Sequence, residues 1–418
     1  MRRKLYSLFL TSLAHFSKIA TSFLILKFIS VYLGVSGVGA LGNYMSLIAA
    51  MLLLSGGGIS NGVIKYCSLY KDDSRKLNDF IFNASLYMMT ASIILFLLFV
   101  FLAKNISNVI FGGEYIDVIY FLGFAQFLIA FVNFYFSWIN GIGKTKKYLY
   151  LQIFSFVFGA PVSWFLIKNF QLRGAAYALV IVYVIPLIGI MYSFERIQKI
   201  SFKNINFYWW RKIYPFSLMA ITSFFSAPVV EILIRNHLLK MVDYGEVGIW
   251  QAAMRLSSAY LGFFFIFLSY VFIPKISSLI EKEKIAKEVF GMIGFVWAIF
   301  LIGGLILLIN IDFFTALFLS PDFFKIEKYI KYQLVGDFFR VGSFVIGYFF
   351  IAKSRVKLYI FIEVFQYIIF FLLSLNSMRI FDEPLKGVMG SYSMSFFISF
   401  LICIILFFNV LKDGFENE

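Results

Sequence analysis

The sequence predicts an all-α, polytopic membrane protein with about 12 transmembrane helices in two six-helix lobes. Three observations lead to this fold class: the composition, the length of the apolar segments and an internal repeat. Of the 418 residues, 61% are hydrophobic, 21% are aromatic and only 14% are charged. A soluble protein of this length needs more charge on its surface, so that class is excluded. Two cysteines are too few for a disulfide scaffold.

The N-terminal half contains six apolar blocks, and each can cross a hydrocarbon core about 30 Å thick as a helix of roughly 20 residues. We expect these helices at residues 5–31, 39–64, 80–103, 118–140, 148–167 and 175–194. The first block contains Lys18 and Lys27 and is too long for the apolar region of a signal peptide, so we expect it to be retained. The run Gly56-Gly57-Gly58 in the second block favours either a bent helix or close helix packing.

The C-terminal half shows the same pattern in six further apolar blocks. We expect these helices at residues 213–235, 248–273, 289–310, 332–352, 358–376 and 388–410. Pro228 and Pro274 lie in the first of these blocks and directly after the second, at positions where a helix can kink. An even number of crossings places both termini on the same side of the membrane.

The positive charges in the loops predict the orientation, because Lys and Arg accumulate in short cytoplasmic loops. The termini and the loops on their side contain 23 Lys and Arg residues, whereas the opposite loops contain 9. We therefore predict that both termini are cytoplasmic and that the net charge of +15 is mainly a topology signal. A nucleic-acid partner is not expected from this charge.

An internal repeat divides the chain into halves. Two pairs of similar segments are each separated by 209 residues: Val38-Gly39 with Val247-Gly248, and Lys144-Thr145-Lys146 with Lys353-Ser354-Arg355. We predict one lobe at residues 1–200 and the other at residues 201–418. Because each lobe has an even number of helices, equivalent helices run in the same direction. The lobes are therefore predicted to be related by a pseudo-two-fold axis along the membrane normal.

The loops offer no place for enzyme chemistry. None on the outward side exceeds roughly 20 residues, which is too short for a catalytic domain. The sequence contains no phosphate-binding P-loop, no zinc-protease motif and no cluster of Cys and His residues. We predict that the chain is not an enzyme and has neither a cofactor nor a metal site.

Ionisable residues inside the apolar blocks are the candidate functional residues, because a charge at mid-membrane costs about 2.5–3.5 kcal/mol and usually faces a cavity. The basic candidates are Lys18, Lys27, Arg235 and Arg255, with Lys65 at the cytoplasmic end of the second block. The acidic candidates are Glu231, Asp337 and Glu363. Glu231 and Arg235 share a helical face, as do Asp337 and Arg340, so each pair can partly neutralise itself.

Lys18 and Arg255 have no acidic residue within one helical turn, so we expect them to line a water-filled cationic cavity. For two other lysines, an interpretation without a functional role is equally good. Lys27 lies near the outward end of its helix, where its side chain can snorkel to the headgroups. Lys65 lies at the cytoplasmic face, where the topology alone explains it.

Particular segments also resemble a known family. These are the stretch Asn61–Tyr66, the lysines of the first helix and above all the run VGIWQAAMRLS at Val247–Ser257, which continues to Ile273-Pro274-Lys275-Ile276. In these motifs the chain is similar to the bacterial O-antigen and enterobacterial common antigen flippases of the multidrug/oligosaccharidyl-lipid/polysaccharide exporter superfamily. One departure is Met45, which stands where the family pattern leads us to expect an arginine.

The resemblance implies a flippase that moves undecaprenyl-diphosphate-linked oligosaccharide to the periplasmic leaflet of the inner membrane through a central cationic cavity. It implies substrate contacts from Lys18, Lys27, Lys65 and Arg255, to which we add Arg235. Glu231, Asp337 and Glu363 are candidates for coupling to a proton or sodium ion, and passive flipping is left open. Further partners that fit this function are membrane lipid, a polysaccharide polymerase and a chain-length regulator.

Three other functions stay open at this point. One is an ion-coupled multidrug or cation exporter of the same superfamily, although such an exporter should favour acidic residues in its cavity. The second is a membrane polysaccharide polymerase or glycosyltransferase; a polymerase should carry a large periplasmic loop. The third is a non-catalytic assembly protein, which gives no reason for Lys and Arg residues at membrane depth.

Overall fold

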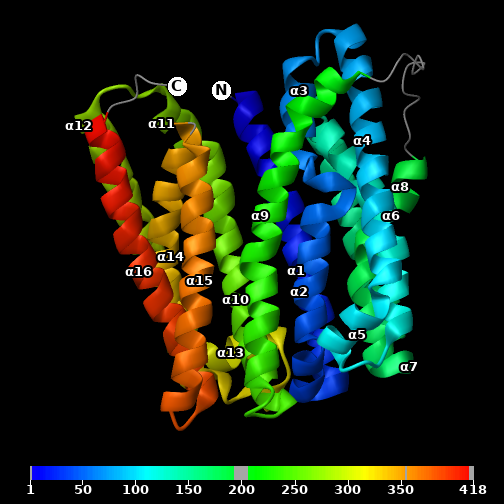
Figure 1. Cartoon of the computed structure of the whole chain (residues 1–418), viewed down its shortest axis with the longest axis vertical. Coiled ribbons are helices and arrows are strands. Elements are labelled where there is room, and N and C mark those ends of the chain that lie inside the picture. The colour runs from blue at the N-terminus through cyan, green and yellow to red at the C-terminus, as the bar shows by residue number, and fades with distance from the viewer. Residues whose placement is uncertain (1, 193–205, 354, 414–418) are drawn as a thin grey trace. The chain divides into compact units, whose positions relative to one another are not determined.

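The computed structural model describes residues 2–192, 206–353 and 355–413, and helices make up almost all of these ranges (Figure 1). The α-helices are α1 (Arg2–Ala40), α2 (Gly42–Leu54), α3 (Ser60–Leu69), α4 (Ser74–Phe101), α5 (Ala103–Phe111), α6 (Ile116–Gly141), α7 (Thr145–Val184), α8 (Pro186–Tyr192), α9 (Phe207–Leu238), α10 (Tyr244–Phe267), α11 (Ile273–Ser278), α12 (Lys282–Ile309), α13 (Ile311–Phe318), α14 (Ile326–Ala352), α15 (Val356–Ile380) and α16 (Pro384–Asp413). A 3₁₀ turn, η1 (Ser55–Gly58), joins α2 to α3, and a π-helical turn, η2 (Leu268–Phe272), joins α10 to α11. A second 3₁₀ turn, η3, covers Pro321–Phe323.

The predicted fold class is confirmed. Within the described ranges, nine helices are long and apolar enough to cross a membrane, and the bent pair Gly42–Gly58 and Ser60–Leu69 supplies a tenth. Each of the twelve predicted apolar blocks overlaps one or more of the helices. The chain is therefore a multi-pass α-helical membrane protein.

Helix α7 contains two of the predicted spans rather than one. A straight helix of 40 residues would be about 60 Å long, twice the thickness of a hydrocarbon core. The helix breaks at Gln171, whose φ of 49° and ψ of −131° are not helical. Beyond the break the chain folds back, so that the Ser155 hydroxyl donates to the carbonyl of Val182 at 3.0 Å. At the reversal, Gly174 approaches the backbone so closely that a Cβ there would lie 2.0 Å from the Leu166 carbonyl oxygen.

The chain forms two compact units, and each unit consists of two separate stretches of the sequence. Unit 1 consists of Met1–Leu33 and Asn43–Val229, and unit 2 consists of Gly34–Gly42 and Val230–Glu418. The boundaries between the two units fall within helices. They lie at Gly34 of α1, which has a φ of 66°, directly after Gly42 at the start of α2, and directly after Val229 of α9, next to Pro228. The predicted lobe boundary at residues 200 and 201 lies outside the described residues.

Unit 1 is built around α6, which packs against α3, α4 and α7. Near the ends of these helices the start of α9 closes a core that includes Val63, Cys67, Phe80 and Ile213, none of which is exposed. The Trp209 indole of α9 donates to Asp79 Oδ2 at 2.7 Å and fixes this helix to α4. Unit 1 therefore holds the first half of α9 firmly beside α3.

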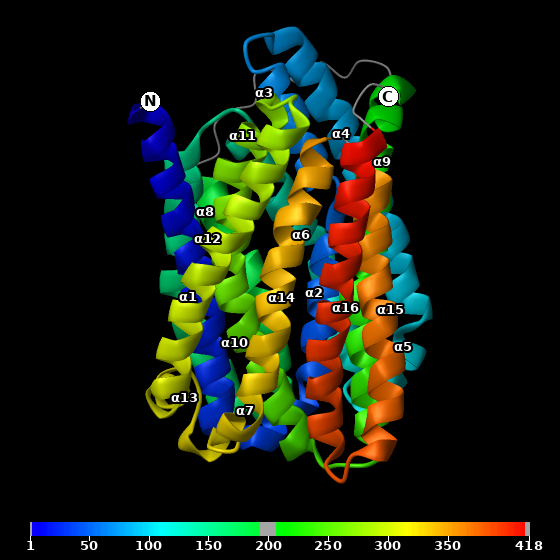
Figure 2. The same ribbon diagram turned by 90° about the vertical axis from the view of Figure 1, so that its left-hand side faces the viewer.

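Unit 2 is built around α14, which packs against α10, α12, α15 and α16. Figures 1 and 2 both show α14, α15 and α16 running side by side. Large aromatic side chains fill this bundle; Phe349, Phe370, Phe396 and Phe407 have no exposed surface. The segment Gly34–Gly42 joins this unit by packing on the start of α10.

The segment Gly34–Gly42 and the start of α10 approach each other closely at two points, and these points involve equivalent residues of the internal repeat. A Cβ built at Gly39 would lie 1.9 Å from the Tyr244 carbonyl oxygen, and one at Gly248 would lie 2.1 Å from the Val35 carbonyl oxygen. Val35 and Tyr244 are 209 residues apart, as are Gly39 and Gly248. The two close approaches thus involve residues that the 209-residue offset relates to each other.

Candidate functional site

The lysines of α1 lie in unit 1. The Lys18 side chain is exposed, and its Nζ lies 5.9 Å from the centroid of the Tyr183 ring, at a distance typical of a cation–π contact. Lys27 lies further along the same helix and is half-buried. Both lysines belong to a segment that is long and apolar enough to span the membrane. The structure thus places two cationic side chains along one transmembrane segment.

Lys65 lies on α3, directly after a break in a transmembrane helix. Its Nζ is 5.5 Å from the ring centroid of Tyr66 and 6.0 Å from that of Phe216 on α9. The break is formed by Gly56, Gly57 and Gly58, whose φ values are 67°, 79° and 67°. L-residues with a side chain rarely adopt these angles, so the glycines produce a bend. Lys65 therefore lies beside the rings of Tyr66 and Phe216, whereas Lys18 lies beside the ring of Tyr183.

Hydrogen bonds from neighbouring helices stabilise this break. The Ser217 hydroxyl of α9 donates to the Gly57 carbonyl at 2.5 Å and forms a second hydrogen bond, 2.8 Å long, with the Tyr87 hydroxyl of α4. The glycines are also packed closely, because a Cβ at Gly58 would lie 2.2 Å from the Cβ of Ala220. Both interpretations of the glycine run therefore hold: the helix bends there, and its neighbours approach closely.

Arg235 and Arg255 lie in unit 2, on α9 and α10. Arg235 has no exposed surface; its Nη2 donates to Gln251 Oε1 at 2.6 Å, and its guanidinium lies 5.1 Å from the centroid of the Trp250 ring. Gly42 makes room for this side chain, because a Cβ there would lie 2.8 Å from Arg235 Nε. Arg255 is half-buried one helical turn after Gln251. The two arginines thus differ in access, and only Arg255 has part of its surface exposed.

Asp337 of α14 is the most fully enclosed of the acidic candidates. Its carboxylate has no exposed surface and accepts hydrogen bonds from Ser257 Oγ at 2.6 Å, from Tyr392 at 2.6 Å and from the Tyr260 hydroxyl. Gln333 Nε2 adds a longer contact of 3.5 Å. An ionised carboxylate accepts several such donors, which offset the cost of removing its charge from water. The carboxylate therefore ties α10 and α16 to α14.

Arg340 and Asp337 are linked through a shared tyrosine hydroxyl. Arg340 Nη1 donates to the Tyr392 hydroxyl at 2.8 Å, and the same hydroxyl donates to Asp337 Oδ1. Arg340 Nη2 donates to Tyr367 at 3.1 Å, and the guanidinium lies 4.9 Å from the Phe396 ring centroid. The predicted pairing within α14 is thus achieved by a hydroxyl from α16. Glu231 of α9 and Glu363 of α15 are half-buried.

Sequence reasoning missed the tyrosines that contact Asp337 and Arg340. Tyr260, Tyr367 and Tyr392 come from three different helices, and nothing in their local sequence separates them from the other tyrosines among the 25 in the chain. Gln333 offered the one usable signal, because it lies one helical turn before Asp337 inside an apolar block. Partners from distant helices cannot be found by local spacing.

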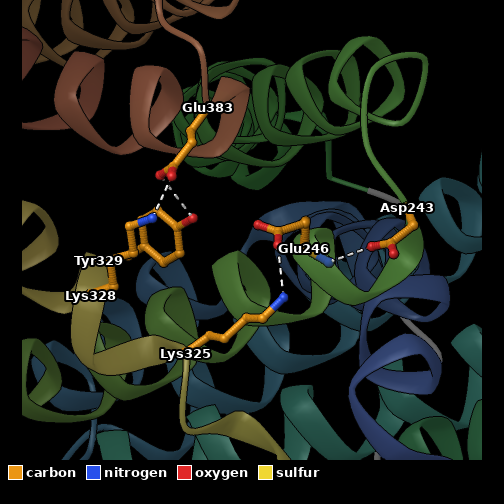
Figure 3. Close-up of polar contacts among 6 residues, drawn as sticks. All are labelled: Asp243, Glu246, Lys325, Lys328, Tyr329 and Glu383. Carbon is orange, nitrogen blue, oxygen red and sulfur yellow. Dashed lines mark hydrogen bonds and ion pairs between the residues drawn. The ribbon is translucent and has the colours of Figure 1, made fainter.

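A cluster of charged side chains lies at the start of α10, at the start of α14 and directly before α16 (Figure 3). The topology predicted from the sequence places this end of the helices on the outward side. Lys325 pairs with Glu246 at 3.5 Å, and Glu383 accepts hydrogen bonds from Lys328 and from the Tyr329 hydroxyl, the latter at 3.3 Å. Asp243 caps α10 by accepting from the Glu246 backbone amide at 2.9 Å. The bond from Lys328 lowers the pKa of the Glu383 carboxyl.

Unit 1 has a comparable pair at the same end of the repeat. Asp117 of α6 accepts from Arg173 Nε at 3.3 Å and from the Tyr177 hydroxyl at 2.8 Å. In both units an acidic group, a basic group and a tyrosine join the start of the central helix to the turn between the following two spans. Among the described residues, no group of three or more His, Cys, Asp or Glu side chains is arranged to hold a metal ion. These clusters fix helix ends.

The fold resembles that of solved membrane transporters. The inward-facing conformation of a multidrug resistance MATE family transporter matches with a TM-score of 0.76 and 14% identity, covering 96% of each chain. The inward closed conformation of the lipid II flippase MurJ matches with a TM-score of 0.73 and 16% identity, covering 96% of this chain and 87% of that chain. The chain thus has the fold of these polytopic membrane proteins.

The sequence comparisons identify the family. The lipid III flippase of Escherichia coli (strain K12) is 28% identical over 400 residues, which cover 92% of this chain and 94% of that protein, and the lipid III flippase of Shigella flexneri matches equally. Residues 5–280 match the model of the polysaccharide biosynthesis protein family. The chain belongs to that family, and its curated relatives are flippases rather than enzymes, as the sequence predicts.

Proposed function

We propose that this protein is a flippase that moves undecaprenyl-diphosphate-linked oligosaccharide from the cytoplasmic to the periplasmic leaflet of the bacterial inner membrane. Lys18, Lys27 and Arg255 carry the proposal: the two lysines place positive charge within a helix that is long and apolar enough to span the membrane, and Arg255 lies half-buried inside the apolar block 248–273. A diphosphate is anionic and a glycan cannot enter hydrocarbon, so such a substrate needs a wet, cationic route. Likeness to lipid III flippases along nearly the full chain supports the same substrate class.

The basic residues have different proposed parts in substrate binding. The guanidinium of Arg255 can make two parallel hydrogen bonds to phosphate oxygens, whereas Lys18, Lys27 and Lys65 act as point charges. The sequence predicts Arg235 among the substrate contacts. Because its side chain has no exposed surface, we propose that it supports the site through Gln251 instead. The lipid tail stays in the bilayer, and access alternates between the two membrane faces, both termini being cytoplasmic.

Asp337 is our choice for ion coupling among the three acidic candidates. It is enclosed and accepts several donors, whereas Glu231 and Glu363 are half-buried. A proton or sodium ion at its carboxylate would compete with the Ser257 and Tyr260 hydroxyls of α10. Ion occupancy would in this way change how firmly α10, which carries Arg255, is held.

Rescue of surface polysaccharide tests the proposed function. The wild-type gene, introduced into a strain from which it has been deleted, should restore the polysaccharide, and Arg255→Ala at equal abundance in the membrane should not. The fold likeness to a MATE transporter favours a multidrug exporter as the second candidate. That candidate predicts normal polysaccharide in the deletion strain and increased sensitivity to cationic drugs.

A further inference from the structure

We infer that Arg235 and Asp337 are positioning residues that clamp α10 from two sides and so fix the direction in which Arg255 points. The inference rests on the proposed function, because it assigns Arg255 the role of the substrate-binding group. It goes further by explaining why a buried cation and a buried anion lie on the two helices that flank α10.

The first clamp is the contact between α9 and α10. Arg235 donates to Gln251 Oε1 at 2.6 Å, and both side chains are almost completely buried. A hydrogen bond from a charged donor is worth more than a neutral one, and burial protects it from competition by water. Trp250, stacked at 5.1 Å from the guanidinium, limits where that group can move. Gln251 lies one helical turn before Arg255, so the clamp acts on the same side of α10.

The second clamp is the contact between α14 and α10. Asp337 accepts from the hydroxyls of Ser257 and Tyr260, and Ser257 is buried. The carboxylate is itself held by Tyr392, which also receives a hydrogen bond from Arg340. A chain of hydrogen bonds from α16 and α14 therefore ends on α10.

The clamps act on roughly opposite faces of α10. Successive residues of an α-helix are rotated by about 100°, which places Gln251 and Arg255 close together on one face and Ser257 and Tyr260 on the other. A helix held on one face can roll, whereas a helix held on opposite faces cannot rotate about its axis. The planar guanidinium needs such a fixed direction, because its two parallel bonds form only when the fork faces the phosphate.

The experiment removes the two hydroxyls of the second clamp while nearly preserving the shape of the side chains. It compares the effect on transport when residue 255 is arginine and when it is lysine. Ser257→Ala combined with Tyr260→Phe should slow transport on the order of tenfold when Arg255 is present, since small misplacements of a binding group are costly. In the Arg255→Lys background the same pair should cost less than about twofold, because a lysine needs no orientation. Ser258→Ala is the matched control: its hydroxyl donates within α10, to the Met254 carbonyl at 2.8 Å.

Hydrogen exchange of the α10 backbone, followed by mass spectrometry on the purified full chain, gives a readout that does not depend on transport. Ser257→Ala with Tyr260→Phe, and separately Gln251→Met, should speed exchange across residues 251–260, and Ser258→Ala should not. Equal loss of transport in both backgrounds, or unchanged exchange, would overturn the inference. Full transport by Arg255→Ala would instead refute the binding role assigned to Arg255, while the exchange measurement would still report whether α10 is clamped.

Discussion

At the scale of single residues, the charged side chains within the helices form two groups: those that are fully buried and those that have part of their surface exposed. Asp337 and Arg235 have no exposed surface, whereas Lys18 is exposed and Arg255 is half-buried. A buried charge requires compensation at all times, and an accessible one can be compensated by water or by an anionic ligand. We expect substitutions of the two groups to have different consequences, chiefly for folding in the first and for transport in the second.

Charge rather than size should decide activity at Arg255 and Lys18. Arg255→Ala should be nearly inactive, and Arg255→Lys should be impaired because it keeps the charge but loses the fork. Lys18→Arg should retain more activity than Lys18→Gln. Rescue of surface polysaccharide, normalised to the amount of protein in the membrane, measures each variant. Wild-type rescue by both Arg255→Ala and Lys18→Gln would show that these residues do not bind the substrate.

The charged cluster at the start of α10 and α14 gives a pH dependence with a definite sign. Lys328 lowers the pKa of Glu383 below its ordinary value of 4.5, so the pair stabilises the folded protein fully at neutral pH. This stabilisation should decrease as the pH falls below about 4.5 and through the lower folded-state pKa. Thermal unfolding in detergent at pH 7 should therefore separate the wild type from Glu383→Gln, and the difference should shrink in acid. A difference that grows in acid would contradict this account.

The candidate charges could be read from the sequence, but their environments could not. Asp337 and Arg235 are conspicuous because they interrupt apolar blocks. Their partners are a tyrosine hydroxyl from α16 and a glutamine from α10, and these residues become neighbours only when the helices pack. The sequence therefore identifies which residues need compensation, whereas the structure shows what supplies it.

At the scale of elements, the important features are breaks inside apolar helices. The bend at Gly56–Gly58 leaves backbone groups without helical partners, and Ser217 supplies one for Gly57. The turn at Gln171 makes two spans out of α7. Hydropathy predicts the two spans within α7 as separate blocks at 148–167 and 175–194, but it predicts α2 and the first half of α3 as one continuous block at 39–64. It does not show which helix completes the hydrogen bonds at a break.

Removing the hydroxyl that satisfies the break should destabilise unit 1. Ser217→Ala leaves the Gly57 carbonyl without this partner and should cost about 1–3 kcal/mol. Gly57→Ala should be worse, because a Cβ there would meet Ala91 and Tyr87 at 2.9 Å in a backbone conformation that alanine avoids. Thermal unfolding of the purified protein measures both variants.

Thr222→Ala is the matched control for Ser217→Ala, since the Thr222 hydroxyl donates within α9, to the Leu218 carbonyl. This control should change the unfolding temperature little. If Ser217→Ala were no more destabilising than Thr222→Ala, the bond to Gly57 would not be what holds the broken helix.

At the scale of the whole molecule, the sequence predicts two repeats with the same orientation in the membrane. The repeat offset of 209 residues reappears as the exchanged contacts of Gly39 with Tyr244 and Gly248 with Val35. Sequence matching finds the offset because glycine is required at both close approaches. It cannot assign Gly34–Gly42 to unit 2, since that depends on packing between segments far apart in the chain.

Cysteine labelling from outside intact spheroplasts tests the predicted topology. Ser74→Cys, in a loop predicted to be cytoplasmic, should stay unmodified, and Asn169→Cys, near the outward turn of α7, should be labelled. Both side chains are exposed, and the native Cys67 and Cys403, which are buried, are replaced first. The reverse labelling pattern would overturn the predicted orientation.

The central claim is that the protein moves a lipid-linked oligosaccharide across the membrane, and the sidedness of that lipid tests it most directly. In spheroplasts depleted of the protein, a polyprenyl-diphosphate oligosaccharide should accumulate and stay protected from a glycan-cleaving enzyme added outside. Expression of the wild type should make it accessible, and expression of Arg255→Ala should not. Equal accessibility with and without the protein, or no accumulation on depletion, would contradict the account.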